Sequence, residues 1–169
     1  MKLECDIEAD ESVSLALKPK EIKRVCKAVL AHEGVTRPCM VSVSFVSEEH
    51  MRQINAEWRD VDATTDVISL ECERPDDPDL GPGEPCELGD IILAPVYVSR
   101  QAQTFGTSEA DETRLLLVHG MLHLLGYDHL DEDEAIAMEA LEEDILADMS
   151  TDGTLGHVVI TRHRTEEGA

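Results

Sequence analysis

The sequence has few aromatic residues and far fewer basic residues than acidic ones. Phe, Trp and Tyr make up 3% of the 169 residues, and 14 Lys and Arg stand against 37 Asp and Glu, which gives a formal net charge of −23. Proteins that bind nucleic acid through a general basic surface draw their affinity from clustered Lys and Arg, so the composition argues against such a surface. Hydrophobic residues nevertheless make up 42% of the chain, and we expect a folded protein whose acidity lies on its surface.

The chain also lacks paired cysteine motifs and long hydrophobic runs. Its cysteines are odd in number, widely spaced and without a C-x-x-C pair, which argues against a disulfide framework or a thiolate zinc knuckle and predicts reduced thiols. No segment approaches the ~20 apolar residues of a membrane helix, and residues 1–6 lack the apolar stretch of a secretory signal. We therefore expect a cytoplasmic protein. The cysteines are Cys5, Cys26, Cys39, Cys72 and Cys86.

The length predicts a single domain, residues 1–169, and the hydrophobic pattern predicts an α+β fold. Alternating or short apolar runs predict strands at residues 3–7, 41–45, 67–70 and 91–94. Apolar stripes that begin near Pro or Ser and end near Gly predict helices at about residues 19–33, 47–58, 95–105 and 108–125. Strands and helices in this order indicate a small mixed sheet packed against helices.

The sequence also predicts a long loop, a disordered tail and a last helix. Residues 71–87 contain four prolines and many acidic residues, so we expect a long exposed loop there, and we expect a disordered tail at residues 162–169. The last helix is expected to bury one apolar face, formed by Ile136, Leu141, Ile145 and Met149. Its opposite, solvated face is expected to hold acidic side chains without chemical roles, namely Glu139, Glu142, Glu143 and Asp144.

Three closely spaced histidines occur in and just after a helix that is apolar on nearly every side. Residues 115–125 are almost all apolar, and His119 and His123 lie within them at i and i+4, on one face of the helix. Gly126 ends this helix, and a short turn leads to His129. Buried imidazoles without partners are costly, so we predict that a divalent ion binds all three. The alternative is that they are hydrogen-bonded core residues.

This ligand set favours zinc and catalysis over a purely structural site. Three neutral imidazoles leave the fourth tetrahedral position of a zinc ion for water, and such sites lower the pKa of that water to about 7. The spacing His119-x-x-x-His123-x-x-Gly126-x-x-His129 matches the ligand positions of the metzincin metalloproteases. Gly120 stands where those proteases have their general-base glutamate, which disfavours peptide hydrolysis.

The segment from His119 to His129, with the sequence HGMLHLLGYDH, resembles the signature of the YbeY family of bacterial metal-dependent endoribonucleases. The resemblance spans about residues 41–149. It includes Asn55, Arg59 and the segments at residues 65–69, 88–91 and 138–142.

The resemblance implies a compact α+β fold and one zinc ion on His119, His123 and His129. It also implies cleavage of single-stranded RNA in ribosomal RNA maturation and ribosome quality control. Arg59 matches a functionally important arginine, and we expect a catalytic role for it because a guanidinium neutralises phosphate charge with two fixed hydrogen bonds. The expected partners are ribosomal RNA precursors and the small ribosomal subunit or its proteins, without DNA or membranes. The ligands leave open other divalent ions.

The basic residues of this acidic chain could form surface ion pairs or a positive path for RNA. Taken without the resemblance, Arg59 most simply forms a surface ion pair with Glu57 or Asp60. RNA must approach a chain of charge −23 against a repulsive mean field, so we expect the basic residues of the first helix to join Arg59 in a positive track to the metal. These residues are Lys18, Lys20, Lys23, Arg24 and Lys27.

Three aspartates and two rival functions are left open. Asp66 and Asp90 either orient a ligand imidazole or serve in turns and caps, and Asp128 either assists proton transfer or forms an Asx turn. The first rival function is a noncatalytic ribosome-assembly factor that the metal stabilises. The second is a metal-dependent hydrolase of another phosphoester.

Overall fold

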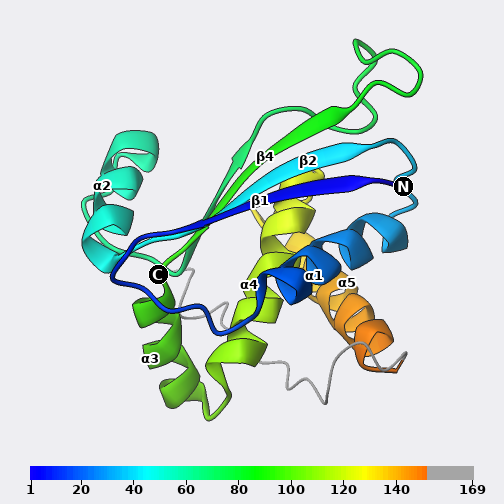
Figure 1. The fold of residues 1–169 in the computed structure, drawn as a ribbon. Coiled ribbons are helices and arrows are strands. Elements are labelled where there is room, and N and C mark those ends of the chain that lie inside the picture. Colours follow the sequence, from blue (N-terminus) through cyan, green and yellow to red (C-terminus); the bar gives the residue numbers. More distant parts are fainter. Residues whose placement is uncertain (152–169) are drawn as a thin grey trace.

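The computed structural model of the chain describes residues 1–151, which form a sheet and a set of helices (Figure 1). The strands are β1 (Leu3–Ala9), β2 (Cys39–Phe45), β3 (Val67–Glu71) and β4 (Cys86–Leu93). The helices are α1 (Pro19–His32), α2 (Glu48–Arg59), α3 (Pro95–Phe105), α4 (Glu109–Leu124) and α5 (Glu132–Thr151). Each strand and helix predicted from the sequence is present. The predicted tail at residues 162–169 lies outside the described residues.

The strands of the described chain form one mixed sheet in the order β1-β2-β4-β3. β1 and β2 are parallel, β2 and β4 are parallel, and β3 runs antiparallel to β4. The predicted α+β fold with a small mixed sheet is therefore confirmed. β3 lies at one edge of the sheet, and α4 contacts it there.

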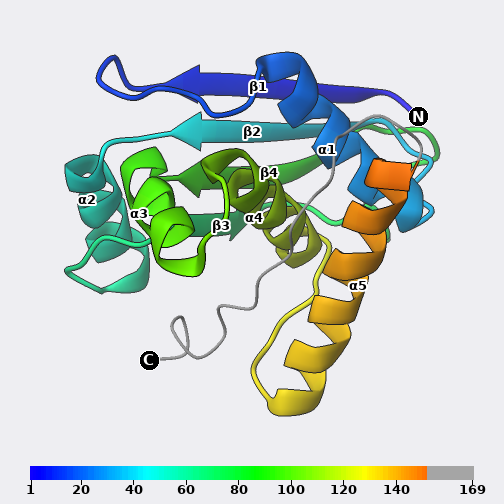
Figure 2. The ribbon, with the colours of Figure 1, turned by 90° about the horizontal axis from the view of Figure 1, so that it is seen from below.

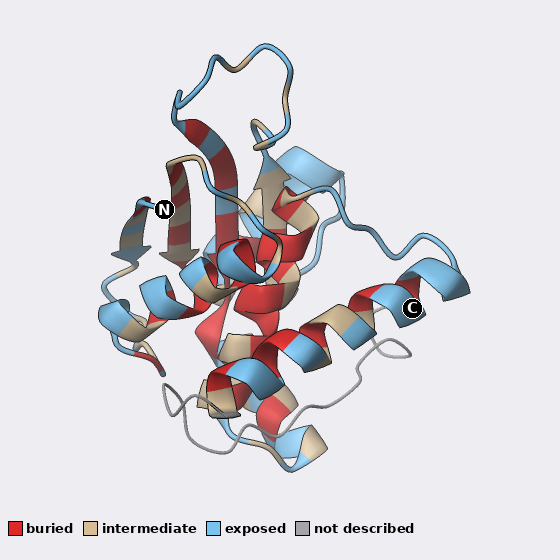
Figure 3. Cartoon of the chain, turned by 90° about the vertical axis from the view of Figure 1, so that its right-hand side faces the viewer, coloured by how far each residue is buried: buried red, intermediate tan, exposed pale blue. Residues whose placement is uncertain are grey.

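Most of the helices cover one face of the sheet. α4 packs against β3 and β4, α1 packs against α4, and α5 contacts both helices (Figures 1 and 2). Figure 3 shows the buried residues gathered between the sheet and these helices. α2 lies apart, at one end of the sheet, where Met51 and Ile54 pack near Ile68 and Ile92 in a smaller cluster.

α4 is the central helix and carries two of the predicted metal ligands. The Ser108 side chain caps its start by accepting a hydrogen bond from the backbone N–H of Asp111 at 3.0 Å, as the sequence predicts. Gly120 faces the sheet, and a Cβ atom there would lie 3.1 Å from Ile91 and 3.2 Å from the Ser69 hydroxyl. The glycine thus lets α4 approach the sheet closely. A glutamate of the metzincin type does not fit at this position.

Two details differ from the sequence predictions. β4 begins at Cys86, inside the segment predicted to be a loop, because this fully buried side chain pairs in register with Cys39. In α5, Ile136 is 52% exposed and Glu142 only 7% exposed. The predicted faces of α5 are therefore wrong at these two positions. Glu142 can be buried because its carboxylate has a hydrogen-bond partner on α4.

The cysteines are free thiols, as predicted. None of the helices within residues 1–151 combines the length and the apolar character that crossing a bilayer requires.

Candidate functional site

The side chains of His119, His123 and His129 converge on one point. The first two come from the last turns of α4, and His129 comes from the loop that follows it. One nitrogen from each ring lies within 4.8 Å of the corresponding nitrogens of the other two, a spacing that fits a metal ion. The rings of His119 and His123 are partly buried, whereas His129 is exposed. The site is thus formed at the end of a buried helix and open on one side.

Hydrogen bonds to two of the rings determine which nitrogens face inward. The Nδ1 atom of His119 lies 2.6 Å from the carboxylate of Glu142, and the Nδ1 atom of His123 lies 2.9 Å from the carbonyl oxygen of Tyr127. Carboxylate and carbonyl oxygens only accept hydrogen bonds, so both Nδ1 atoms carry the proton. The two Nε2 atoms face each other at 3.1 Å. In neutral rings both present lone pairs, an arrangement that a bound cation would satisfy.

The electrostatic surroundings keep His123 uncharged at neutral pH. Burial and, to a smaller extent, the neighbouring His119 and His129 together lower the pKa of His123 to about 4. The Tyr127 carbonyl and the Asp128 carboxylate oppose this shift only weakly. A neutral imidazole is the form that binds metals, so this ring is ready to act as a ligand near pH 7.

The histidines line a cleft of about 880 Å³ between the edge strand β3 and helices α3 and α4. Three arginines from different parts of the chain also line it, namely Arg59, Arg74 and Arg100. Arg100 pairs with Glu48 and lies over the ring of Tyr97, with its Cζ atom 5.4 Å from the ring centroid. A cleft that combines a candidate cation site with guanidinium groups suits a phosphate-containing ligand.

Arg59 ends α2 with an exposed side chain. Within residues 1–151 it forms no ion pair, so the alternative pairing with Glu57 or Asp60 is absent. Arg52, one α2 residue that does pair, contacts Asp62 at 2.6 Å. The structure thus brings Arg59 into the same cleft as the three histidines and leaves its charge available to a ligand.

The expected positive track along α1 is not formed. None of the five basic residues of that helix lines the cleft. α1 and α2 lie toward opposite ends of the molecule in both views (Figures 1 and 2), so the α1 residues do not extend the surface around Arg59. The sequence could not reveal this separation, because it depends on the order of the strands between the two helices. Arg74 and Arg100 take the place predicted for the α1 residues.

Two of the three aspartates form local hydrogen bonds with the backbone. An oxygen of Asp66 accepts a hydrogen bond from the N–H of Val67 at 2.7 Å, and an oxygen of Asp128 accepts one from the N–H of His129 at 2.8 Å. Each bond reaches the next residue, whereas an Asx turn bonds the residue two positions on, and both aspartates line the cleft. The alternative roles of Asp66 and Asp128 therefore stay predictions. Asp90 is exposed and does not line the cleft. The carboxylate that does reach a ligand ring is that of Glu142, which the sequence analysis placed on a solvated face.

Comparisons with known proteins agree with these features. The profile of the family described as Endoribonuclease YbeY matches residues 5–150. A protein of that name from Moorella thermoacetica is 43% identical over 151 residues, covering 86% of this chain and 96% of the relative. Another from Agrobacterium fabrum is 48% identical over 110 residues, 65% of this chain and 64% of the relative. The solution structure of a Thermotoga maritima protein has a similar fold, with a TM-score of 0.56 and 21% identity, and covers 94% of this chain and 99% of that one.

Proposed function

This chain belongs to the YbeY family of endoribonucleases, and on that basis we propose that it is a zinc-dependent enzyme that cuts single-stranded RNA in ribosomal RNA maturation and ribosome quality control. In this proposal His119, His123 and His129 hold the ion, and Arg59 contacts the phosphate. Residues 1–169 act as one domain in the cytoplasm, on RNA of the small ribosomal subunit.

The observation that carries this proposal is the pair of opposed Nε2 atoms of His119 and His123, 3.1 Å apart. Each ring already donates through Nδ1, so two lone pairs face each other unless a cation lies between them. A core histidine pair without a ligand would instead turn one ring to donate to the other. The donor set therefore fits a metal ion such as zinc.

The residues around the histidines suit cleavage of a phosphodiester. A bound divalent ion would supply positive charge to the phosphate and a more acidic water. Arg59 can bind the same phosphate with two parallel hydrogen bonds and stabilise the charge that builds up on its oxygens. Gly120 provides no general base. The open side of the cluster at His129 leaves room for an extended strand.

The test combines metal analysis with an RNA cleavage assay. The purified chain is analysed for metals and then incubated with a single-stranded RNA and with the same sequence as a duplex, before and after chelation and after zinc is restored. We expect about one zinc ion per chain and cleavage of the single strand only. Chelation should abolish cleavage, and zinc should restore it.

Two variants distinguish the proposal from its rivals. Arg59→Ala should lower the cleavage rate by roughly 10²- to 10³-fold with the metal content and fold retained, and His123→Ala should lose the metal. If the metal-loaded chain cuts no RNA, and Arg59→Ala still supports ribosome assembly while His123→Ala unfolds, the chain is a noncatalytic assembly factor. Hydrolysis of small phosphoesters without RNA cleavage would identify another hydrolase.

A further inference from the structure

We propose that Arg74, presented by the acidic loop between β3 and β4, binds a phosphate of the RNA on the opposite side of the histidine cluster from Arg59. This inference rests on the proposed function, since it assigns a second RNA contact to the same cleft. Arg74 has no counterpart among the residues that carry the family resemblance.

The backbone around Arg74 is held in place on both sides. The N–H of Glu73 donates to the carbonyl of Glu87 at 2.8 Å, which continues the pairing of β3 with β4 beyond the end of the strand. The carbonyl of Arg74 itself accepts from the N–H of Asp77 at 3.0 Å and closes a turn. The carbonyl of Pro75 accepts from Arg37 at 3.0 Å. A loop of this composition would otherwise vary in position, but here the residue at its base is well fixed.

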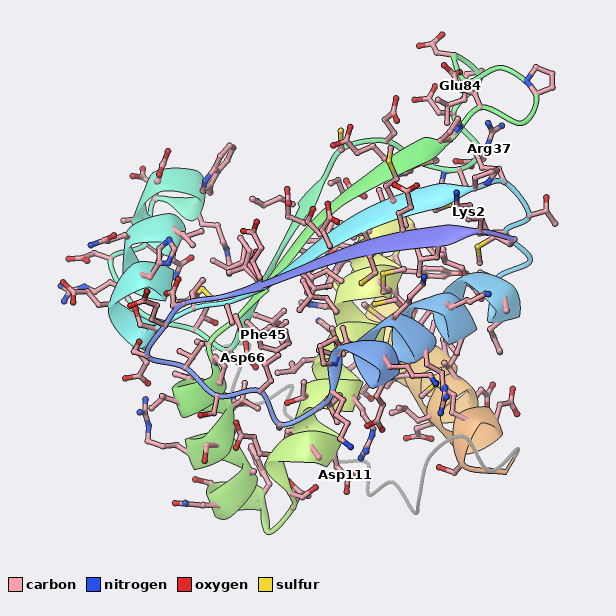
Figure 4. The ribbon with its side chains drawn as sticks, viewed as in Figure 1. Lys2, Arg37, Phe45, Asp66, Glu84 and Asp111 are labelled. Atoms are coloured by element: carbon pink, nitrogen blue, oxygen red, sulfur yellow. The ribbon has the colours of Figure 1, made fainter. Side chains whose placement is uncertain are left out.

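Arg37 holds the rest of the loop as well. Its Nη1 atom donates to the carbonyl oxygens of Gly81 at 2.9 Å and Glu84 at 2.7 Å. Figure 4 shows Arg37, just before β2, beneath the part of the loop that carries Glu84. One guanidinium thus binds three carbonyl oxygens across the loop. This anchoring gives a 14-residue connection a defined shape, although residues 72–85 contain no helix or strand.

The side chain of Arg74 lies against Gly126, in the turn between His123 and His129. A Cβ atom on Gly126 would be 2.9 Å from both Cζ and Nη1 of Arg74. Gly126 lies three residues from His123 and three from His129, in the turn that joins these two candidate ligands. The guanidinium therefore packs on the backbone of that turn, and it lines the same cleft as the three rings.

Arg59 and Arg74 reach the cleft from opposite ends of β3. α2, which carries Arg59, and the loop after β3 lie at opposite ends of the sheet (Figure 1). The five residues of β3 separate these ends by about 13 Å at ~3.3 Å per residue. Ser69, in the middle of β3, packs beside Gly120 and lines the same cleft as His119. A strand of RNA that passes over the histidines would meet one arginine before them and one after them.

The present partner of Arg74 does not prevent phosphate binding. Arg74 forms one contact with Glu71, from Nη2 to the carboxylate at 3.0 Å, and their side chains are 51% and 44% exposed. Exposed ion pairs of this kind contribute little stability. A phosphate can instead accept two parallel bonds from the planar guanidinium, a geometry that favours arginine over lysine.

The test measures RNA binding separately from cleavage. Fluorescence anisotropy with a labelled single-stranded RNA and the chelated, uncleaving protein gives the affinity at several salt concentrations. We expect Arg74→Ala to weaken binding about tenfold, as loss of one charged contact does, and to reduce the slope of log K against log salt by about 0.7. Arg74→Lys should keep the slope and lose part of the affinity. The matched control is Arg52→Ala, which removes an arginine outside the cleft and should change neither quantity.

Changing Arg37 tests the anchoring of the loop. Arg37→Ala should weaken binding as Arg74→Ala does, and the double variant should bind no worse than Arg74→Ala alone. Circular dichroism establishes that each variant is folded. If wild-type protein binds and cuts RNA while Arg74→Ala and Arg52→Ala behave alike, the role of Arg74 is refuted and the proposed function stands. If the wild-type chain neither binds nor cuts RNA, the proposed function itself fails.

Discussion

Two of the candidate metal ligands, His119 and His123, are oriented by residues that would not themselves contact the metal ion. His119 is oriented by Glu142 on α5, and His123 by the backbone carbonyl of Tyr127. A carboxylate bonded to the outer nitrogen of a ligand imidazole fixes its tautomer and makes its inner nitrogen a stronger donor to the metal. Of these two contacts, the one from Glu142 comes from a side chain, so substitution can isolate its role.

Replacing Glu142 should therefore weaken metal binding. We expect Glu142→Ala to lower zinc affinity by about 10- to 100-fold, since His119 loses the acceptor that holds its ring. Glu142→Gln should have a smaller effect, because the amide oxygen still accepts a hydrogen bond. Competition with a chromophoric zinc chelator measures both values.

Asp144→Asn is the matched control for Glu142, since Asp144 is an exposed acid on the same helix. It should leave zinc affinity unchanged. Wild-type zinc affinity in a folded Glu142→Ala protein would show that α5 does not support the site.

At the scale of elements, two glycines set how closely neighbouring segments approach. Gly120 lets α4 lie against β3 and β4. Gly89 lies in β4 with φ of +132°, and a Cβ atom there would be 2.0 Å from the carbonyl oxygen of Leu70. The register between β2 and β4 also shifts in this part of the strand, as a bulge requires. The glycine in the Leu88–Ile91 motif thus has a structural role in joining β3 to β4.

Gly89→Ala should destabilise the fold strongly. The added methyl group meets backbone atoms of β3, which cannot move without breaking the pairing, so we expect a loss of about 3 kcal/mol or more in the free energy of unfolding. Urea unfolding followed by circular dichroism measures this loss.

Gly34→Ala separates the effect of backbone conformation from that of the clash. Gly34 also has a positive φ, of +71°, but no atom lies within 4 Å of the position of its Cβ. The Gly34→Ala variant should lose only about 1 kcal/mol in its free energy of unfolding. Equal losses in the two variants would contradict the close approach of β3 and β4.

At the scale of the whole molecule, part of the acidity lies on the open face of the sheet, away from the cleft. On the edge strand β1, the apolar side chains pack into the core beneath the helices. Acidic side chains alternate with them and point to the open face of the sheet. In the sheet, Asp6 of β1 and Asp90 of β4 are both paired with Ser42 of β2, one on each side of it. The exposed acidic side chains of β1 and β4 are Glu4, Asp6, Glu8, Glu87 and Asp90. These five carboxylates lie outside the arginine-lined cleft, whose own lining includes the acidic residues Asp66, Glu71 and Asp128. The position of each charge, more than the net charge of −23, therefore sets the field that a ligand meets in the cleft.

Salt should act oppositely on folding and on RNA binding. Screening reduces repulsion among the carboxylates, so we expect the melting temperature of the chelated protein to rise by a few degrees when NaCl increases from about 0.05 M to about 0.5 M. RNA binding in the cleft should weaken over the same range, because the release of counterions from the RNA gains less entropy when the bulk salt concentration is high. Calorimetry and anisotropy measure the two trends.

A second series with sucrose in place of salt separates screening from general solute effects. Sucrose should stabilise the fold without weakening RNA binding. A melting temperature that falls with NaCl would mean that attractive ion pairs, such as Arg114 with Glu21 at 2.6 Å, outweigh the repulsion.

The sequence alone was sufficient for the features that depend on near neighbours in the chain. Alternation and 3.6-residue periodicity predicted the strands and helices, and the Ser108 cap followed from side-chain chemistry at one helix end. The spacing of His119 and His123 placed both rings on one helix face, since residues four apart are neighbours there.

Only the tertiary structure decided which distant residues complete the site. Glu142 follows His119 by 23 positions and meets it because α5 packs on α4. Arg74 reaches Gly126 because Arg37 and the β3–β4 pairing hold its loop, whereas the basic residues of α1 are kept away by the strand order. Local periodicity carries no information about such contacts, because they arise from how separate elements pack.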